Sequence, residues 1–225
     1  LQAFHSGVRG LPGPWRGMLD NSTRPEAETL LHEISGKVFA RDLRRRFVAR
    51  GWLHRWENCI PAYLDWEINR TATWRVEDTE KRKDRSYKDG DTHITLTGRI
   101  DRLDRGQDGH GIIDYKTGTV PSNELVLTGE SIQLPFYGLL LEEEKISQAA
   151  YLMLDDEEVR ERMTLSGESF AMLRTAARER LLLLKRRLDA GAAMPAWGDM
   201  ETCRLCEMEG LCRREMWAEP LPSVP

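Results

Sequence analysis

Two neighbouring stretches in the middle of the chain have the residue pattern of β-strands. Residues 92–103 (THITLTGRIDRL) and 111–117 (GIIDYKT) are rich in β-branched side chains, which favours β-strands. The residues between them include Asp108-Gly109, a pair typical of tight hairpin turns. We therefore expect a β-hairpin with Asp108 and Gly109 at the centre of its turn.

This turn would set the register of the two strands, with Asp101 opposite Lys116 and Leu103 opposite Asp114. Paired residues share a face of the sheet, and so do residues two apart along a strand. Asp101, Asp114 and Lys116 are therefore expected on one face. Two neighbouring carboxylates repel unless a cation lies between them, and carboxylate oxygens are the ligands that Mg²⁺ prefers. The pattern predicts a site for metal-assisted hydrolysis.

The alternative interpretation is an ordinary solvated face, where single acids and lysines of a strand usually lie. Asp114, however, directly follows Ile112-Ile113, which is typical of a strand inside a sheet. A carboxylate there costs free energy unless something neutralises it, and this favours the metal site.

The remaining pattern predicts helices and strands on both sides of the hairpin. Apolar residues at helical spacing indicate helices at 25–39, 53–70, 131–144 and 166–190. Strands are expected at 74–81, 146–154 and 159–165, a charged loop at 83–91, and a further loop at 118–129. This order predicts a mixed α/β sheet flanked by helices.

Composition fits one sizeable domain: the chain has 225 residues, of which 40% are apolar and 31% charged. Since no apolar run is long enough for a membrane span and the first residues lack a signal-peptide pattern, we expect no membrane association and a cytoplasmic location. The chain starts with Leu, so we expect a fragment of a longer polypeptide.

The net charge of −4 means that any contact with DNA has to rely on a local basic surface. Two basic runs are candidates, although such runs are often only solvated faces. They are Arg41, Arg44, Arg45, Arg46 and Arg50, and Lys81, Arg82, Lys83, Arg85 and Lys88.

Three motifs occur in a characteristic order. GRIDR contains Asp101, IIDYKTG contains Asp114 and Lys116, and QLPFY places Gln133 and Tyr137 four residues apart. Together they resemble the PD-(D/E)xK nuclease superfamily, in its RecB/AddB-type branch, from about residue 66 to 212. The resemblance implies an α/β fold with a restriction-endonuclease-like mixed central sheet flanked by helices.

The same resemblance implies roles for the site residues. Asp101, Asp114 and the backbone carbonyl of Tyr115 would bind Mg²⁺ or Mn²⁺. Lys116 would orient or deprotonate the attacking water and stabilise the transition state, and the catalytic set would include Gln133 and the nearby tyrosine of Q-x3-Y.

The resemblance further implies a metal-dependent DNA exonuclease that acts at DNA ends, as the C-terminal module of an AddB-like helicase/nuclease subunit in double-strand break repair. DNA and a helicase/nuclease partner subunit would be its partners. The alternative is a catalytically silent nuclease-like scaffold for DNA binding or a subunit interface. We expect an N-terminal arm or linker at 1–25, the nuclease core with preceding helices at 26–195 and a cysteine-containing tail at 196–225.

Many RecB-type nucleases carry a metal-binding histidine before the first strand. His5 and His32 are the upstream candidates here, but neither lies in a convincing match, so we expect this histidine before residue 1. Glu67 and Glu77 are upstream acids that could support the metal.

Three cysteines near the C-terminus, Cys203, Cys206 and Cys212, have the spacing C-x2-C-x5-C, which indicates metal ligation by thiolates. Zinc and an iron-sulfur cluster are both compatible with thiolates. AddB-like nucleases and CRISPR-associated iron-sulfur nucleases resemble this arrangement, which implies a structural [4Fe-4S] cluster in the full-length protein. Cys59 is either the fourth ligand or a buried core cysteine.

Overall fold

The computed structural model describes residues 1–155, 158–193, 203–204 and 206–212. They build one five-stranded sheet in the order β1-β2-β3-β4-β5. Only β3 and β4 run parallel, and the other neighbours are antiparallel. The strands are β1 (Trp74–Asp89), β2 (Thr92–Gly106), β3 (His110–Lys116), β4 (Ile146–Asp155) and β5 (Glu158–Ser166).

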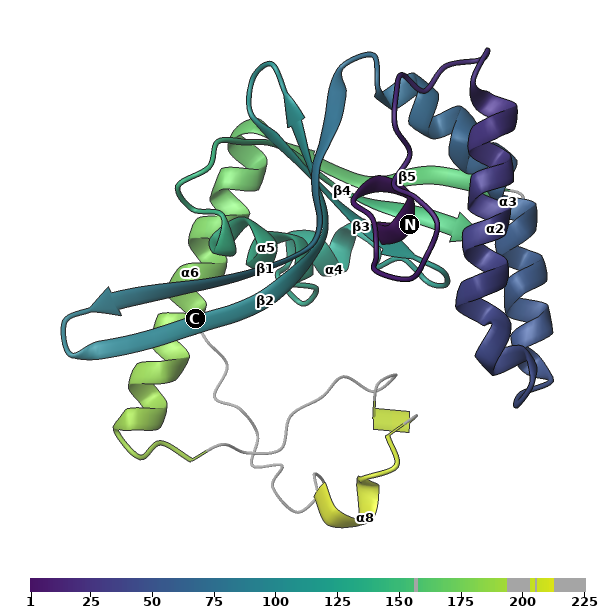
Figure 1. The fold of residues 1–225 in the computed structure, drawn as a ribbon. Helices are drawn as coiled ribbons and strands as arrows, with labels where there is room; N and C mark the ends of the chain where they lie inside the picture. Colours follow the sequence, from purple (N-terminus) through teal and green to yellow (C-terminus); the bar gives the residue numbers. More distant parts are fainter. Residues whose placement is uncertain (156–157, 194–202, 205, 213–225) are drawn as a thin grey trace.

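Helices cover both faces of this sheet (Figure 1). One face packs on α1 (Gln2–His5), α2 (Arg24–Leu43) and α3 (Val48–Arg70). The other packs on α4 (Asn123–Leu127), α5 (Gln133–Leu140) and α6 (Gly167–Asp189). A short helix, α8 (Glu209–Cys212), follows in the described part of the tail. Within the described residues, no helix has the length and apolar character needed to cross a membrane.

Alternating side chains of the central strands feed two separate cores. Ile112 and Tyr151 join the core under α5 and α6, whereas Ile113, Ala150 and Leu152 join the core under α2 and α3. Because successive side chains of a strand point to opposite faces, an almost continuous apolar run such as ISQAAYLML serves both cores. The mixed α/β sheet flanked by helices is confirmed.

The second half of β1, residues 83–89, takes up most of the stretch expected to be a charged loop at 83–91, and Gly90 and Asp91 form the turn to β2. It pairs with β2 along its whole length, for example Arg85 with Leu96 and Tyr87 with Ile94. Tyr87 is buried, and its hydroxyl donates a hydrogen bond to the carbonyl of Leu139 at 2.7 Å. The many charges hid the strand because only one strongly apolar residue in this half of β1 faces the core.

Helix boundaries also differ from expectation. The predicted loop at 118–129 contains α4, where the Ser122 hydroxyl accepts a hydrogen bond from the Leu125 amide and Val126 is buried. α3 begins five residues earlier than expected, at Val48, and α5 is confined to Gln133–Leu140.

The expected hairpin between β2 and β3 is confirmed, but its predicted register is wrong by two residues. Leu103 pairs with Ile112, so this register places Asp101 opposite Asp114 and not opposite Lys116. Because strand side chains alternate with a period of two, a shift of two residues keeps the same side chains on the same face.

The reason for the shift lies in the turn. The Gly106 amide donates a hydrogen bond to the Gly109 carbonyl at 2.8 Å, so the central residues are Gln107 and Asp108. Gly109 has φ +144°, and a Cβ on it would lie 2.3 Å from the Lys145 carbonyl oxygen. Because the Lys145 carbonyl, just before β4, lies so close, position 109 requires glycine. Gly109 therefore flanks the turn and is not one of its two central residues.

Candidate active site

Two carboxylates lie side by side where β2 and β3 meet. Asp101 is partly buried, and its Oδ2 accepts a hydrogen bond from the Tyr115 amide at 3.2 Å. Asp114, the neighbour of Tyr115 along β3, is 1% exposed. The hairpin thus brings together two acids that are thirteen positions apart in the sequence.

Lys116 and Gln133 form a closed set of polar contacts with Asp114. The Lys116 ammonium lies 2.7 Å from Asp114 Oδ2 and donates a hydrogen bond to Gln133 Oε1 at 2.6 Å. The Gln133 amide donates in turn to Asp114 Oδ1 at 2.6 Å. Since Gln133 is the first residue of α5, this helix orients both charged groups of β3.

Two tyrosines complete the surroundings of the ion pair. The Tyr137 hydroxyl, one turn along α5, donates a hydrogen bond to Asp114 Oδ1 at 3.2 Å. The Lys116 ammonium also lies 5.2 Å from the ring centre of Tyr151 on β4, a distance typical of a cation–π contact. The structure therefore brings together the predicted Asp114, Lys116, Gln133 and Tyr137.

Burial and mutual repulsion change the acidity of both carboxyl groups. Burial, followed by the charge of Asp114, raises the pKa of Asp101 to about 6, against the opposing effects of the Tyr115 amide and Lys116. Burial also raises the pKa of Asp114, while Lys116 and Tyr137 oppose the rise. Such perturbed carboxyl groups are common at functional sites.

One acid near Asp101 was not predicted from the sequence. Glu80 lies on β1 between Thr79, which pairs with Arg102, and Lys81, which pairs with Ile100. The register therefore puts Glu80 opposite Asp101, and its charge contributes to the raised pKa of Asp101. Its φ of +55° is unusual for a residue other than glycine, and nothing in the sequence of this charged stretch signals it.

The donor set fits a divalent cation of the magnesium type. Asp114 Oδ2 is buried, and its charged neighbour is the Lys116 ammonium at 2.7 Å. Across the part of the chain that the structure describes, no three His, Cys, Asp or Glu side chains gather as metal ligands. The site would therefore offer Asp101 and Asp114, and leave other positions to water, a backbone carbonyl and substrate, as Mg²⁺ tolerates.

The upstream histidine candidates lie elsewhere. His5 is bonded to the Tyr63 hydroxyl at 2.5 Å and lies 3.5 Å from an Arg102 nitrogen, on the α3 side. His32 is on α2, 3.9 Å from a Glu57 oxygen. Neither contact involves the two aspartates of the hairpin.

The two upstream acids named from the sequence have other partners as well. Glu67 on α3 forms a buried ion pair with Arg102, with one nitrogen–oxygen distance of 3.0 Å. Glu77 lies 2.9 Å from a ring nitrogen of His110. Glu67 therefore anchors α3 to the sheet rather than joining the site.

The cysteines are distributed between core and tail. Cys59 is 2% exposed within α3 and belongs to the core under that helix, as the core-cysteine interpretation expects. Cys203 and Cys212 are partly buried and Cys206 is exposed. The three tail cysteines do not form one metal-ligand group in the described residues.

Comparison with known proteins gives a family. A solved structure titled "Crystal structure of SSO0001" is 17% identical to this chain, with a TM-score of 0.35. The match covers 74% of this chain and 73% of the solved chain. No curated protein matches the chain. The model of the PD-(D/E)XK nuclease superfamily matches residues 1–213, nearly the whole sequence and all of the hairpin, and the chain therefore belongs to the PD-(D/E)XK nuclease superfamily.

Proposed function

We propose that this chain is a metal-dependent exonuclease that hydrolyses phosphodiester bonds at DNA ends. Membership of the PD-(D/E)XK nuclease superfamily supports nuclease activity, DNA as substrate and Mg²⁺ or Mn²⁺ as cofactor. The single observation that carries the proposal is the contact of Lys116 with both Asp114 and Gln133, beside the second carboxylate of Asp101.

In this proposal Asp101, Asp114 and the backbone carbonyl of Tyr115 hold the metal. A bound Mg²⁺ would lower the pKa of water and neutralise charge on the attacked phosphate. The raised pKa values of the two aspartates favour such a cation, because a nearby positive charge lets both carboxyl groups ionise.

Lys116 is the group that acts on the reacting atoms. Its ammonium lies beside Asp114 and Gln133. From there it would orient the attacking water and stabilise the pentavalent transition state. Gln133 and Tyr137 hold Asp114 from the opposite side, through Oδ1. Oδ2 contacts the Lys116 ammonium. A bound ion would share this oxygen, and Gln133 Oε1 would keep the ammonium close to the ion.

The finer assignment follows the order of the motifs. The sequence of GRIDR, IIDYKTG and Q-x3-Y, followed by three cysteines, resembles AddB-like subunits. We therefore place the chain as the C-terminal nuclease module of a helicase/nuclease subunit, with a helicase/nuclease partner subunit, in double-strand break repair.

The test compares the cleavage of linear and covalently closed DNA. The parent protein with Mg²⁺ or Mn²⁺ should degrade linear DNA and leave closed circles intact. Asp114→Asn and Lys116→Ala should each lower the rate by about 10²-fold or more, whereas Asp84→Asn, at an exposed position of β1, should not. A parent protein that binds linear DNA without degrading it supports the scaffold function instead.

The cysteine triplet has its own proposal and its own test. Its spacing supports a [4Fe-4S] cluster in the full-length protein, with Cys203, Cys206 and Cys212 as ligands. Protein purified without oxygen should be brown, absorb visible light and contain iron. A colourless protein with bound zinc would refute the iron-sulfur proposal and would leave the nuclease proposal unaffected.

A further inference from the structure

Positive charge is concentrated at the end of the α2–α3 pair. Residues 41–56 carry six arginines and one acid, a net charge of +5, while the whole chain has −4. The remaining residues therefore carry −9. This segment, which we call the α2–α3 tip, is where an otherwise acidic protein can approach a polyanion.

The arginines of the tip are available for binding. All six are exposed, and none makes an ion pair or side-chain hydrogen bond that the structure records among its described residues. They are Arg41, Arg44, Arg45, Arg46, Arg50 and Arg55.

The other basic run differs in this respect. Residues 80–91 of the β1–β2 hairpin carry five basic and four acidic residues, a net charge of +1. Some of these basic groups are already engaged: Arg85 pairs with Glu142 and Glu143, and Lys81 with Glu77. The hairpin is close to neutral, so the tip is the stronger attractor for phosphates.

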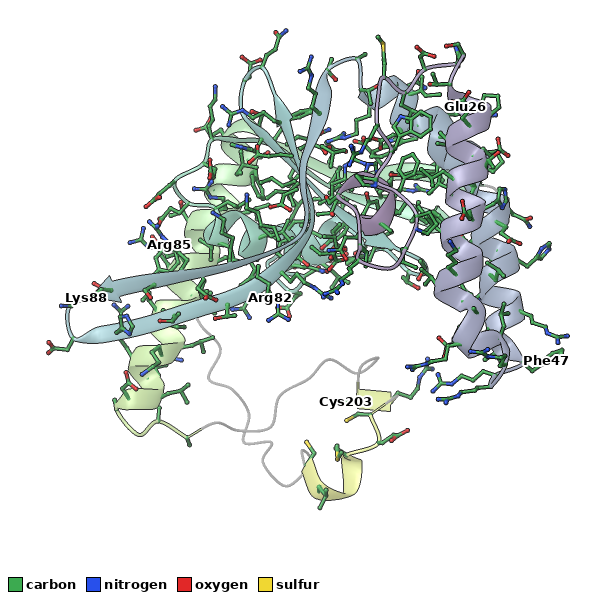
Figure 2. All side chains as sticks on the ribbon, viewed as in Figure 1. Glu26, Phe47, Arg82, Arg85, Lys88 and Cys203 are labelled. Carbon is green, nitrogen blue, oxygen red and sulfur yellow. The ribbon has the colours of Figure 1, made fainter. Side chains whose placement is uncertain are left out.

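An aromatic side chain projects from the middle of the tip. Phe47 is 85% exposed, and the Arg50 guanidinium lies 6.0 Å from its ring centre. Figure 2 shows Phe47 at the end of the α2–α3 pair that is far from Glu26, with nitrogen-tipped side chains around it. Exposed aromatics interleaved with arginines bind single-stranded nucleic acid, because bases stack on the ring and phosphates pair with the cations.

A cavity lies beside the tip, on the face of the sheet that α2 and α3 cover. Its volume is about 590 Å³, and its walls include Trp52 and Arg55 of α3, Val38 of α2, and Thr117. Thr117 directly follows Lys116, and Trp52 is 45% exposed. The cavity therefore adds a second exposed aromatic, Trp52, and a tip arginine, Arg55, to the surface around Phe47.

We infer that the α2–α3 tip binds the single-stranded part of the DNA substrate, with a base stacked on Phe47 and phosphates held by the tip arginines. This inference deepens the proposed function and rests on it for the identity of the polyanion. Binding by itself is independent of hydrolysis, so the two can fail separately.

The first test measures the affinity of a fluorescent oligothymidylate without metal, in the Asp114→Asn background. Phe47→Ala should weaken binding by roughly 5- to 100-fold. It should change the affinity for an abasic strand much less, because that strand keeps its phosphates but has no base to stack. Met18→Ala is the matched control, since Met18 is 74% exposed and should leave affinity unchanged.

The second test separates the two basic regions by salt dependence. Affinity falls as salt rises, so the slope of log affinity against log salt is negative. Replacing Arg45 and Arg46 by serine should make this slope shallower by about 1.4, which is about 0.7 for each phosphate contact. The same replacement of Arg82 and Lys88 on the β1–β2 hairpin should leave the slope nearly unchanged.

Several results would overturn the inference. One is unchanged oligothymidylate binding by Phe47→Ala, and another is an equal loss on the abasic strand. A third is an equal effect of both double replacements on the salt slope, and a fourth is binding of the tip to anionic phosphatidylglycerol vesicles in place of the oligonucleotide. If the tip binds as expected while the parent protein cleaves no DNA, the nuclease proposal fails and the binding site remains.

Discussion

Replacing Asp101 by asparagine should stabilise the metal-free protein at neutral and alkaline pH. The pKa of Asp101 rises from 3.8 to about 6 on folding, so the folded protein holds this proton more tightly than the unfolded chain. Stability from this group is therefore complete below about pH 4, and it is lost as the pH rises to about 6. Asparagine does not ionise, so it avoids that loss.

The magnitude follows from the size of the shift. Roughly two pKa units at about 1.4 kcal/mol each give an upper value of about 3 kcal/mol. Because Asp101 is only partly buried, solvent screens some of this penalty, and about 1–2 kcal/mol is the expected gain. The asparagine side-chain oxygen can still accept the hydrogen bond from the Tyr115 amide, so the local geometry is retained.

Urea denaturation of the metal-free protein across about pH 4 to pH 8 measures this difference. The advantage of Asp101→Asn should be near zero at the acidic end and reach its full size above about pH 6. Saturating Mg²⁺ should stabilise the parent protein and reduce that advantage. Asp84→Asn, at an exposed site, provides the control. A difference that does not change with pH would refute the electrostatic reasoning.

Two further predictions concern residues on either side of the sheet. Gln133→Leu removes the hydrogen-bond acceptor of Lys116 and a hydrogen-bond donor to Asp114. The kcat for DNA cleavage should therefore fall by about 10- to 100-fold, with KM little changed. A raised KM at constant kcat would contradict a positioning role. Arg102→Met leaves Glu67 as a buried, unpaired acid and should lower the free energy of unfolding by about 3–5 kcal/mol. Adding Glu67→Leu should recover part of this loss in the same denaturation assay, and a double variant no more stable than the single one would show that the pair is not coupled.

Local patterns in the sequence were sufficient for the elements and the main site. The β-branched residues in 92–103 and 111–117 and the helical spacing elsewhere predict the order of elements that the structure has, apart from α1, α4 and α8, which the sequence did not predict. The gathering of Asp101, Asp114 and Lys116 follows from the period of two along a strand. It therefore survives an error of two residues in the register.

Contacts between distant segments decided the rest. The turn is displaced because Gly109 lies against the Lys145 carbonyl, and β1 continues through its charged half because β2 pairs with it and Tyr87 reaches Leu139. Tyr87 and Leu139, like Gly109 and Lys145, are far apart in the sequence, so local patterns could not reveal these two contacts.

What the sequence by itself determined was the type and order of the elements and the identity of the acids and lysine, since both depend on neighbours along the chain. Only the tertiary structure decided which neighbours the other acids have. It placed Glu80 opposite Asp101 and paired Glu67 with Arg102 in a buried ion pair. It also left the arginines of the tip exposed around Phe47. Strand pairing and helix docking set these distances, because burial and charge compensation are properties of the packed molecule and not of the chain.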